Sequence, residues 1–195
     1  MNKIRQIYLD NFIQRFDKDG IIQYLSNTDF ENFQKEEYIF MNSINIEIHS
    51  FLYFYDNYKK DKLIIFLPGI GPGHTAYIRE IELLAEKGYL VLTLDYCGCG
   101  ESKGETLLSV NEPTRDVHDL ILELTKKNIK RINELNDYEI TIIGHSLGAY
   151  TALNTINLHK DIKKAVIISG FINIIKEFMG MSHIHLPFLF KTIIK

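Results

Sequence analysis

Residues 139–148 read Glu-Ile-Thr-Ile-Ile-Gly-His-Ser-Leu-Gly. The first five residues are mostly apolar and β-branched, as in a buried strand, and helical spacing of apolar residues begins directly after Gly148. The segment therefore predicts a strand that passes at once into a helix through a sharp turn at Ser146. Such a turn strains the backbone, and glycines at 144 and 148 remove the side chains that would clash in it.

Strands of the same kind flank this segment on both sides. The run Leu-Ile-Ile-Phe-Leu at 63–67 and the runs at 89–94 and 165–168 are apolar throughout or nearly so, which is typical of strands buried on both faces. Helical spacing lies between them, in one helix that Thr75 would cap and in another that starts at Pro113. Alternating strands and helices predict a mostly parallel sheet with right-handed crossovers and helices on both faces, an α/β fold.

The N-terminal part follows other patterns. Residues 1–38 place apolar side chains at helical spacing, so we expect a helical lead-in. From about residue 39 to 56 apolar and polar residues alternate, which predicts half-buried antiparallel strands. The core is then expected over residues 39–170.

Composition excludes several classes of protein. The chain has 195 residues, a net charge of −3 and a pI near 6.2, so it offers no basic face to nucleic acid. Two cysteines cannot make a dense disulfide framework, which favours a reducing, cytoplasmic location. No apolar run approaches the length of a membrane span, and the N-terminus has no signal-peptide pattern. We therefore expect neither export nor a transmembrane anchor.

The loops after the strands are where chemistry is expected, since ligands of such sheets bind at the carboxyl ends of the strands. A serine at the turn of 144–148 would present its hydroxyl at the positive end of a helix. There both an attacking group and a developing oxyanion are stabilised. Ser146 is therefore the candidate nucleophile.

Three motifs in register extend this interpretation. Gly-His-Ser-Leu-Gly at 144–148 resembles the nucleophile elbow of the α/β-hydrolase family, which includes esterases, lipases and serine aminopeptidases. Leu-Pro-Gly-Ile-Gly-Pro-Gly at 67–73 stands where that family has its oxyanion loop, and Asp-Tyr-Cys-Gly-Cys-Gly-Glu-Ser at 95–102 resembles its Asp-x-x-Gly-x-Gly-x-Ser loop. The resemblance covers about 63–170. It implies a three-layer α/β/α hydrolase fold with antiparallel N-terminal strands and an incomplete C-terminal half, and the start of a cap at 171–195.

The resemblance also implies roles. Ser146 would attack the carbonyl of a small ester, thioester or amide, and the backbone N–H groups of Leu147 and Ile70 would stabilise the oxyanion. Pro68 stands where many relatives have His, which leaves the main-chain donor intact. Asp95 would hold its loop by accepting backbone N–H groups. No cofactor is implied.

Other candidate residues favour structural roles. Cys97 and Cys99 cannot complete a four-coordinate zinc site without further ligands, so no metal is expected there. His145 lies inside the elbow motif, where a histidine is common, and is interpreted as structural.

A catalytic acid and a histidine base are not evident. In this fold they follow the serine on later loops. Asp161 enters the fourth parallel strand at the opposite edge of the sheet, and Glu177, His183 and His185 lie where relatives begin the cap. The expectation is that acid and base come after Lys195, that the chain turns over slowly or not at all, and that an exposed sheet edge favours self-association.

Three alternatives stay open from the residues. Pro-Gly-x-Gly after a strand with a downstream Gly-His-Ser-Leu-Gly also fits an acyl-carrier transacylase. A dinucleotide-binding domain would need a third glycine where His74 stands, so its fingerprint fails. The third alternative is a non-catalytic remnant that acts as a binding module.

Overall fold

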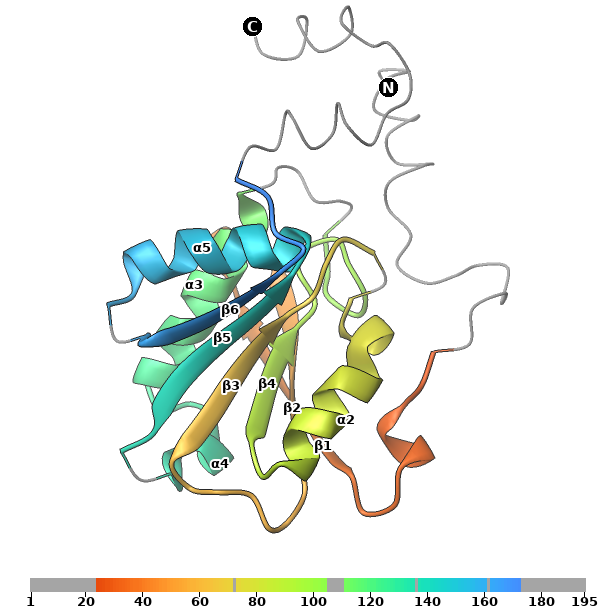
Figure 1. Ribbon diagram of the computed structural model, residues 1–195. Helices are drawn as coiled ribbons and strands as arrows, with labels where there is room; N and C mark the ends of the chain where they lie inside the picture. The colour runs from red at the N-terminus through yellow and green to blue at the C-terminus, as the bar shows by residue number, and fades with distance from the viewer. Residues whose placement is uncertain (1–23, 72, 105–110, 136, 161, 173–195) are drawn as a thin grey trace, which may run out of the picture.

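The computed structural model describes residues 24–71, 73–104, 111–135, 137–160 and 162–172 (Figure 1). They form a six-stranded sheet in the order β1-β2-β4-β3-β5-β6. The strands are β1 (Gln34–Met41), β2 (Glu47–Phe54), β3 (Lys62–Leu67), β4 (Leu90–Leu94), β5 (Glu139–His145) and β6 (Lys164–Ile168). β2 runs antiparallel to β1 and β4, whereas β3, β4, β5 and β6 are mutually parallel. The predicted α/β class and the antiparallel N-terminal strands are confirmed.

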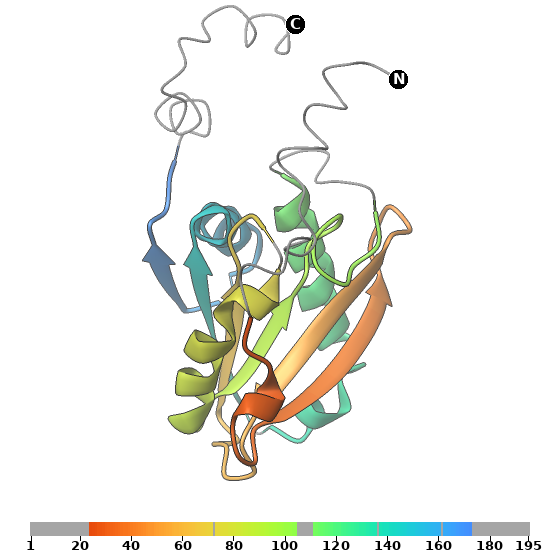
Figure 2. The same ribbon diagram turned by 90° about the vertical axis from the view of Figure 1, so that its right-hand side faces the viewer.

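Helices cover both faces of this sheet. They are η1 (Asn27–Asp29), η2 (His74–Tyr77), α2 (Ile78–Glu86), α3 (Glu112–Thr125), α4 (Lys130–Asn133) and α5 (Leu147–Leu158). α2 lies on one face, and α3 and α5 lie on the other (Figure 1). The arrangement is the expected three-layer sandwich. Figure 2 shows β1 at one edge of the sheet and β6 at the other.

Successive residues of the central strands belong to different cores. Ile65 belongs to the same core as Val117 of α3, whereas its neighbour Ile64 belongs to the same core as Ile81 of α2. This follows from the alternation of side chains along a strand. A strand between two helical layers must therefore be apolar at every position, which is the pattern that the sequence shows at 63–67.

The first crossover begins differently from its prediction. Thr75 lies inside the 3₁₀ turn η2, and α2 begins at Ile78 with Tyr77 at its N-cap and no side-chain cap. The expectation that Thr75 caps a helix is wrong. The crossover instead begins with the 3₁₀ turn η2. The N–H of His74, the first residue of η2, donates to the carboxylate of Asp95 and holds the start of this turn.

Two expectations for the N-terminal part also need correction. Residues 34–38 belong to β1 and not to a helical lead-in, and β2 is almost entirely buried and not half-buried. The reason is that both faces of β2 are covered: Ile48, Leu52 and Phe54 belong to the core that includes α3, and Phe51 and Tyr53 belong to the core that includes α2. Residues 1–23 of the expected lead-in, and residues 173–195 of the expected cap, lie outside the described residues.

β6 forms an edge of the sheet among the described residues, and all five of its residues are exposed. Its apolar side chains include Val166, Ile167 and Ile168. Self-association through this edge stays a prediction. Over the described ranges, no helix combines the length and the hydrophobicity that crossing a membrane requires.

Candidate active site

Ser146 stands alone between two regular elements. β5 ends at His145, α5 begins at Leu147, and the backbone of Ser146 has φ 53° and ψ −115°. A positive φ is uncommon for a residue with a side chain and costs about 1–3 kcal/mol, so the surrounding structure must impose it. The Ser146 N–H donates to the carbonyl of Ile168 at 3.0 Å, which anchors the turn to the neighbouring strand.

Two glycines make this turn sterically feasible. A Cβ at Gly148 would clash with the backbone oxygen of Leu67, and a Cβ at Gly144 would clash with the backbone of Gly148. The start of α5 can approach the end of β3 this closely only because Gly148 has no side chain, and it can lie this close to β5 only because Gly144 has none. The role predicted for these two glycines therefore has a direct steric cause.

The Gly-rich loop after β3 lies against the turn of residues 144–148, called the nucleophile turn here after the role expected of Ser146. A Cβ built on Gly69 would lie 3.4 Å from the Cβ of Ser146 and 3.4 Å from Nδ1 of His145. Ile70, which follows Gly69, is exposed, whereas Leu147 is buried. Among the described residues, no acceptor takes a hydrogen bond from the N–H of either residue. Both N–H groups named for the oxyanion thus belong to segments beside Ser146.

A single tyrosine hydroxyl lies between these two segments. The Tyr77 oxygen is 3.0 Å from the backbone nitrogen of Gly69 and 2.8 Å from Nδ1 of His145. Burial raises the pKa of Tyr77, so the hydroxyl keeps its proton at neutral pH. The half-buried His145 is therefore held by a hydrogen bond to Tyr77.

Asp95 holds the loop after β4. Its buried carboxylate accepts the backbone N–H of His74 at 2.7 Å and that of Glu101 at 2.9 Å, and Nδ1 of His74 lies 2.9 Å away. Its own carbonyl accepts the hydroxyl of Ser102. These contacts are those of an architectural residue, as the motif predicted.

The sequence is similar to known proteins over most of this core. Residues 58–193 match the family described as serine aminopeptidase, S33. The chain belongs to this family of α/β hydrolases.

Relatives of this S33 chain include both sequences and structures. It is 30% identical over 123 residues to a 2-hydroxy-6-oxononadienedioate/2-hydroxy-6-oxononatrienedioate hydrolase of Escherichia coli O139:H28, which covers 61% of this chain and 40% of that protein. Esterase Pf2001 of Pyrococcus furiosus superposes with a TM-score of 0.70 at 26% identity, over 90% of this chain and 66% of the esterase. The α/β hydrolase GrgF of Penicillium has a TM-score of 0.60 at 19% identity, over 72% and 47%. The chain thus spans two fifths of the curated relative's length.

The remaining residues named as acid or base candidates are not placed. Asp161, Glu177, His183 and His185 lie outside the described residues. No histidine in the described ranges hydrogen-bonds to the Ser146 hydroxyl: His74 contacts Asp95, His145 contacts Tyr77, and His118 contacts His159. The fifth described histidine, His49, contacts Glu37 and Glu47.

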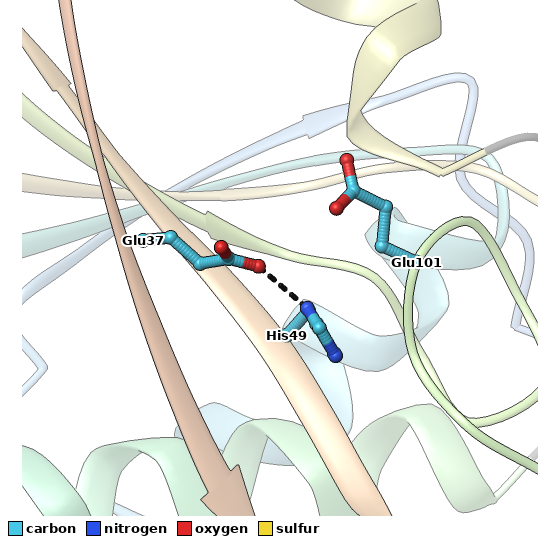
Figure 3. A group of neighbouring side chains, drawn as sticks. All are labelled: Glu37, His49 and Glu101. Carbon is cyan, nitrogen blue, oxygen red and sulfur yellow. Dashed lines mark hydrogen bonds and ion pairs between the residues drawn. The ribbon is translucent and has the colours of Figure 1, made fainter.

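One cluster in this S33 chain has the composition of a metal site. Glu37, His49 and Glu101 each bring one ligand atom, all within 4.8 Å of one another (Figure 3). However, His49 contacts Glu37 through Nδ1 at 2.6 Å and Glu47 through Nε2 at 3.1 Å. Burial lowers the pKa of His49, but these two hydrogen bonds outweigh it and raise the pKa above its ordinary value. Both ring nitrogens of His49 thus already have carboxylate partners, so in this geometry the cluster is a hydrogen-bonded network of His49 with acidic side chains.

Within the described ranges, no cluster of metal-ligating side chains includes either cysteine. Cys97 and Cys99 are both buried in the described part of the chain, and they form no disulfide there. The N–H of Cys97 donates to the carboxylate of Asp116, which also accepts Nδ2 of Asn42 at 2.8 Å. Burial raises the pKa of Asp116 to about 6.

Sequence reasoning missed Tyr77 and Asp116, although both contact the loops it singled out. Tyr77 lies at the start of α2 and Asp116 lies within α3, and no local motif surrounds either residue.

Three surface cavities of 380–400 Å³ open elsewhere on the molecule, and none of these three is lined by Ser146.

Proposed function

We propose that this chain carries the nucleophile and the oxyanion donors of a serine hydrolase that acts on carboxylic esters, thioesters or amides. The observation that carries the proposal is the positive φ of Ser146 between β5 and α5, which places this residue outside both elements. Strain of this kind persists where the structure over-determines it, and it clusters at active sites.

The reaction follows from the elements around Ser146. Its hydroxyl oxygen bonds to the carbonyl carbon of the substrate, while the carbonyl π electrons move to oxygen and the hydroxyl proton passes to a general base. The oxyanion accepts hydrogen bonds from the N–H groups of Leu147 and Ile70. Collapse of this intermediate breaks the bond to the leaving group, which takes up a proton, and leaves acyl-Ser146 for hydrolysis by water.

Two features of the fold support the assignment of Leu147 and Ile70 as oxyanion donors. Leu147 is the first residue of α5, so its N–H has no partner within the helix and lies at the positive end of the helix dipole. Ile70 belongs to the loop that lies against the turn. Loss of one such donor typically lowers the rate about 100- to 1000-fold.

The relatives support the substrate class. The Escherichia coli relative is a hydrolase of an oxo-dienedioate, and the Pyrococcus structure is an esterase. Attack on a carbonyl carbon is consistent with both names, and the esterase is the relative that supports an ester substrate.

Covalent labelling tests the proposal. We expect a fluorophosphonate probe to label the chain at Ser146, found by mass spectrometry of the labelled peptide, and Ser146→Ala to abolish labelling. Ser169→Ala is the matched control, since Ser169 is also a serine with positive φ, directly after the next strand. Absence of labelling in the wild type, or equal labelling of Ser146→Ala, would contradict the proposal. Hydrolysis of p-nitrophenyl esters then measures whether the acyl-enzyme turns over.

A further inference from the structure

The hydroxyl of Tyr77 joins two backbone segments that are 76 residues apart in the chain numbering, Gly69 and His145. The direction of one of these hydrogen bonds is determined by chemistry. A backbone N–H can only donate, so the Tyr77 oxygen accepts from Gly69. In the other, the phenol donates to Nδ1 of His145 when that nitrogen is unprotonated and accepts from it when it carries a proton.

Each partner immediately precedes a residue of the proposed site. Gly69 precedes Ile70, whose N–H is a proposed oxyanion donor, and His145 precedes the nucleophile Ser146. The bond to Gly69 restrains the backbone of the Gly-rich loop directly, and the bond to His145 restrains the side chain beside Ser146. The Tyr77 oxygen thus links the two segments beyond the point where the pairing of β3 with β5 ends, at Leu67 and Gly144.

The tyrosine itself is held firmly. It is the N-cap residue of α2, and its ring packs against Phe66 of β3 with ring centroids 5.3 Å apart. It also contacts the ring of His145, with centroids 5.6 Å apart. The hydroxyl is thus fixed from the side of the sheet that α2 covers.

We infer that Tyr77 is a positioning residue that sets the spacing between the oxyanion loop and the nucleophile turn, through its hydrogen bonds to Gly69 and His145. The inference rests on the proposed function of Ser146. It differs from a packing role, because packing requires the ring of Tyr77 whereas positioning requires its hydroxyl.

Tyr77→Phe separates these two roles because it keeps the ring. We expect the maximal rate of fluorophosphonate labelling at Ser146 to fall about 10- to 100-fold, since a misplacement near 1 Å costs on that order. The probe concentration that gives half the maximal rate should stay unchanged, because the hydroxyl touches the site's backbone and not the probe. Tyr55→Phe is the matched control: Tyr55 is also partly buried, and its hydroxyl donates to Glu82 at 2.9 Å.

Substitutions of His145 test the other end of the link. His145→Asn places an amide near the position of Nδ1 that can accept from or donate to the Tyr77 hydroxyl, so it should keep most of the labelling rate. His145→Leu leaves the Tyr77 hydroxyl without this partner and should slow labelling as Tyr77→Phe does. If the two residues act as one unit, Tyr77→Phe combined with His145→Leu should be little slower than either single variant.

The outcomes are distinct. If the wild type labels at Ser146 and Tyr77→Phe labels equally fast, the positioning role is wrong and the proposed function stands. If Asn and Leu at position 145 are equally slow, the link through Nδ1 is wrong. If the wild type is not labelled at all, both the proposed function and this inference fail. Circular dichroism and urea unfolding of each variant show whether a slow rate reflects loss of fold, and the His145→Asn result decides the role where Tyr77→Phe does not fold.

Discussion

Oδ1 of Asp95 lies 2.7 Å from the backbone nitrogen of His74 and 2.9 Å from Nδ1 of the same residue, and both residues are fully buried. The imidazole of His74 also stacks on Phe51 of β2, with ring centroids 3.8 Å apart. One carboxylate therefore ties the loop after β3 to the loop after β4. The loop after β3 also contacts the nucleophile turn, so the bond between Asp95 and His74 helps to position this loop beside Ser146.

Asp95→Asn tests this connection. The carboxylate accepts from N–H groups of His74 and Glu101 on different oxygens, so an amide would face at least one donor with another donor. A buried donor left without an acceptor costs about 1–3 kcal/mol, and more where a charge was involved. We expect the free energy of unfolding to fall by about 2–4 kcal/mol in urea titrations.

The control for Asp95→Asn is Glu101→Gln. Glu101 contacts Asp95 through its backbone N–H, which this substitution retains, and its side chain is exposed. Stability should change by less than about 0.5 kcal/mol. Equal losses in the two variants would show that the carboxylate of Asp95 is not the anchor of these loops.

Gly148→Ala should be strongly destabilising despite the high helix propensity of alanine. The added Cβ would clash with backbone oxygens of Leu67 and Pro68, which cannot rotate away as a side chain could. We expect a loss of about 1–3 kcal/mol or more, because the start of α5 must move away from β3. The melting temperature or the urea midpoint measures it.

Asn157→Ala provides the comparison for Gly148→Ala. Asn157 lies in the same helix and is exposed, so the alanine there should be neutral or slightly stabilising. A Gly148→Ala variant as stable as Asn157→Ala would rule out the close approach of α5 to β3.

Asp116 should make stability depend on pH. Burial raises its pKa from 3.8 to about 6, so the folded state holds a proton that the unfolded state releases in this interval. The contribution is therefore fully present below pH 4 and is lost as the pH rises towards 6, with a slope of up to about 1.4 kcal/mol per pH unit. Urea unfolding at a series of pH values measures this slope.

The comparison is with Asp116→Asn, which does not titrate. This variant should be less stable at every pH, because its amide faces donors from Asn42 and Cys97. The difference in unfolding free energy between wild type and variant should nevertheless narrow as the pH rises from 4 to 6. A constant difference across that interval would mean that Asp116 does not titrate there.

Arg131 connects α4 to the antiparallel edge. Its guanidinium lies 4.0 Å from the centre of the Phe54 ring and forms an ion pair with Glu36. Arg131→Lys retains the charge but loses the planar stacking and the second N–H contact, so we expect a loss of about 0.5–1.5 kcal/mol in thermal or urea unfolding. Lys130 is the exposed neighbour of Arg131, and Lys130→Arg should change the free energy of unfolding by less than about 0.5 kcal/mol, as surface substitutions usually do. Equal effects at 130 and 131 would contradict the role of the stack.

The sequence by itself determined the sheet and the place of the strand-to-helix turn at Ser146. An apolar run such as 63–67 can be satisfied only between two covering layers, and Gly144 and Gly148 permit one sharp turn around Ser146, so both features follow from local composition. The helical lead-in failed at residues 34–38 because strand pairing with β2 overrides local helical spacing.

Only the tertiary structure decided which side chains hold the loops together. Tyr77 reaches His145 across 68 positions, and Asn42 reaches Asp116 across 74. No periodicity or motif marks such contacts, because they depend on how α2 and α3 pack on opposite faces of the sheet. The nucleophile turn is thus a property of a few adjacent residues, whereas its alignment with the Gly-rich loop is a property of the packed fold.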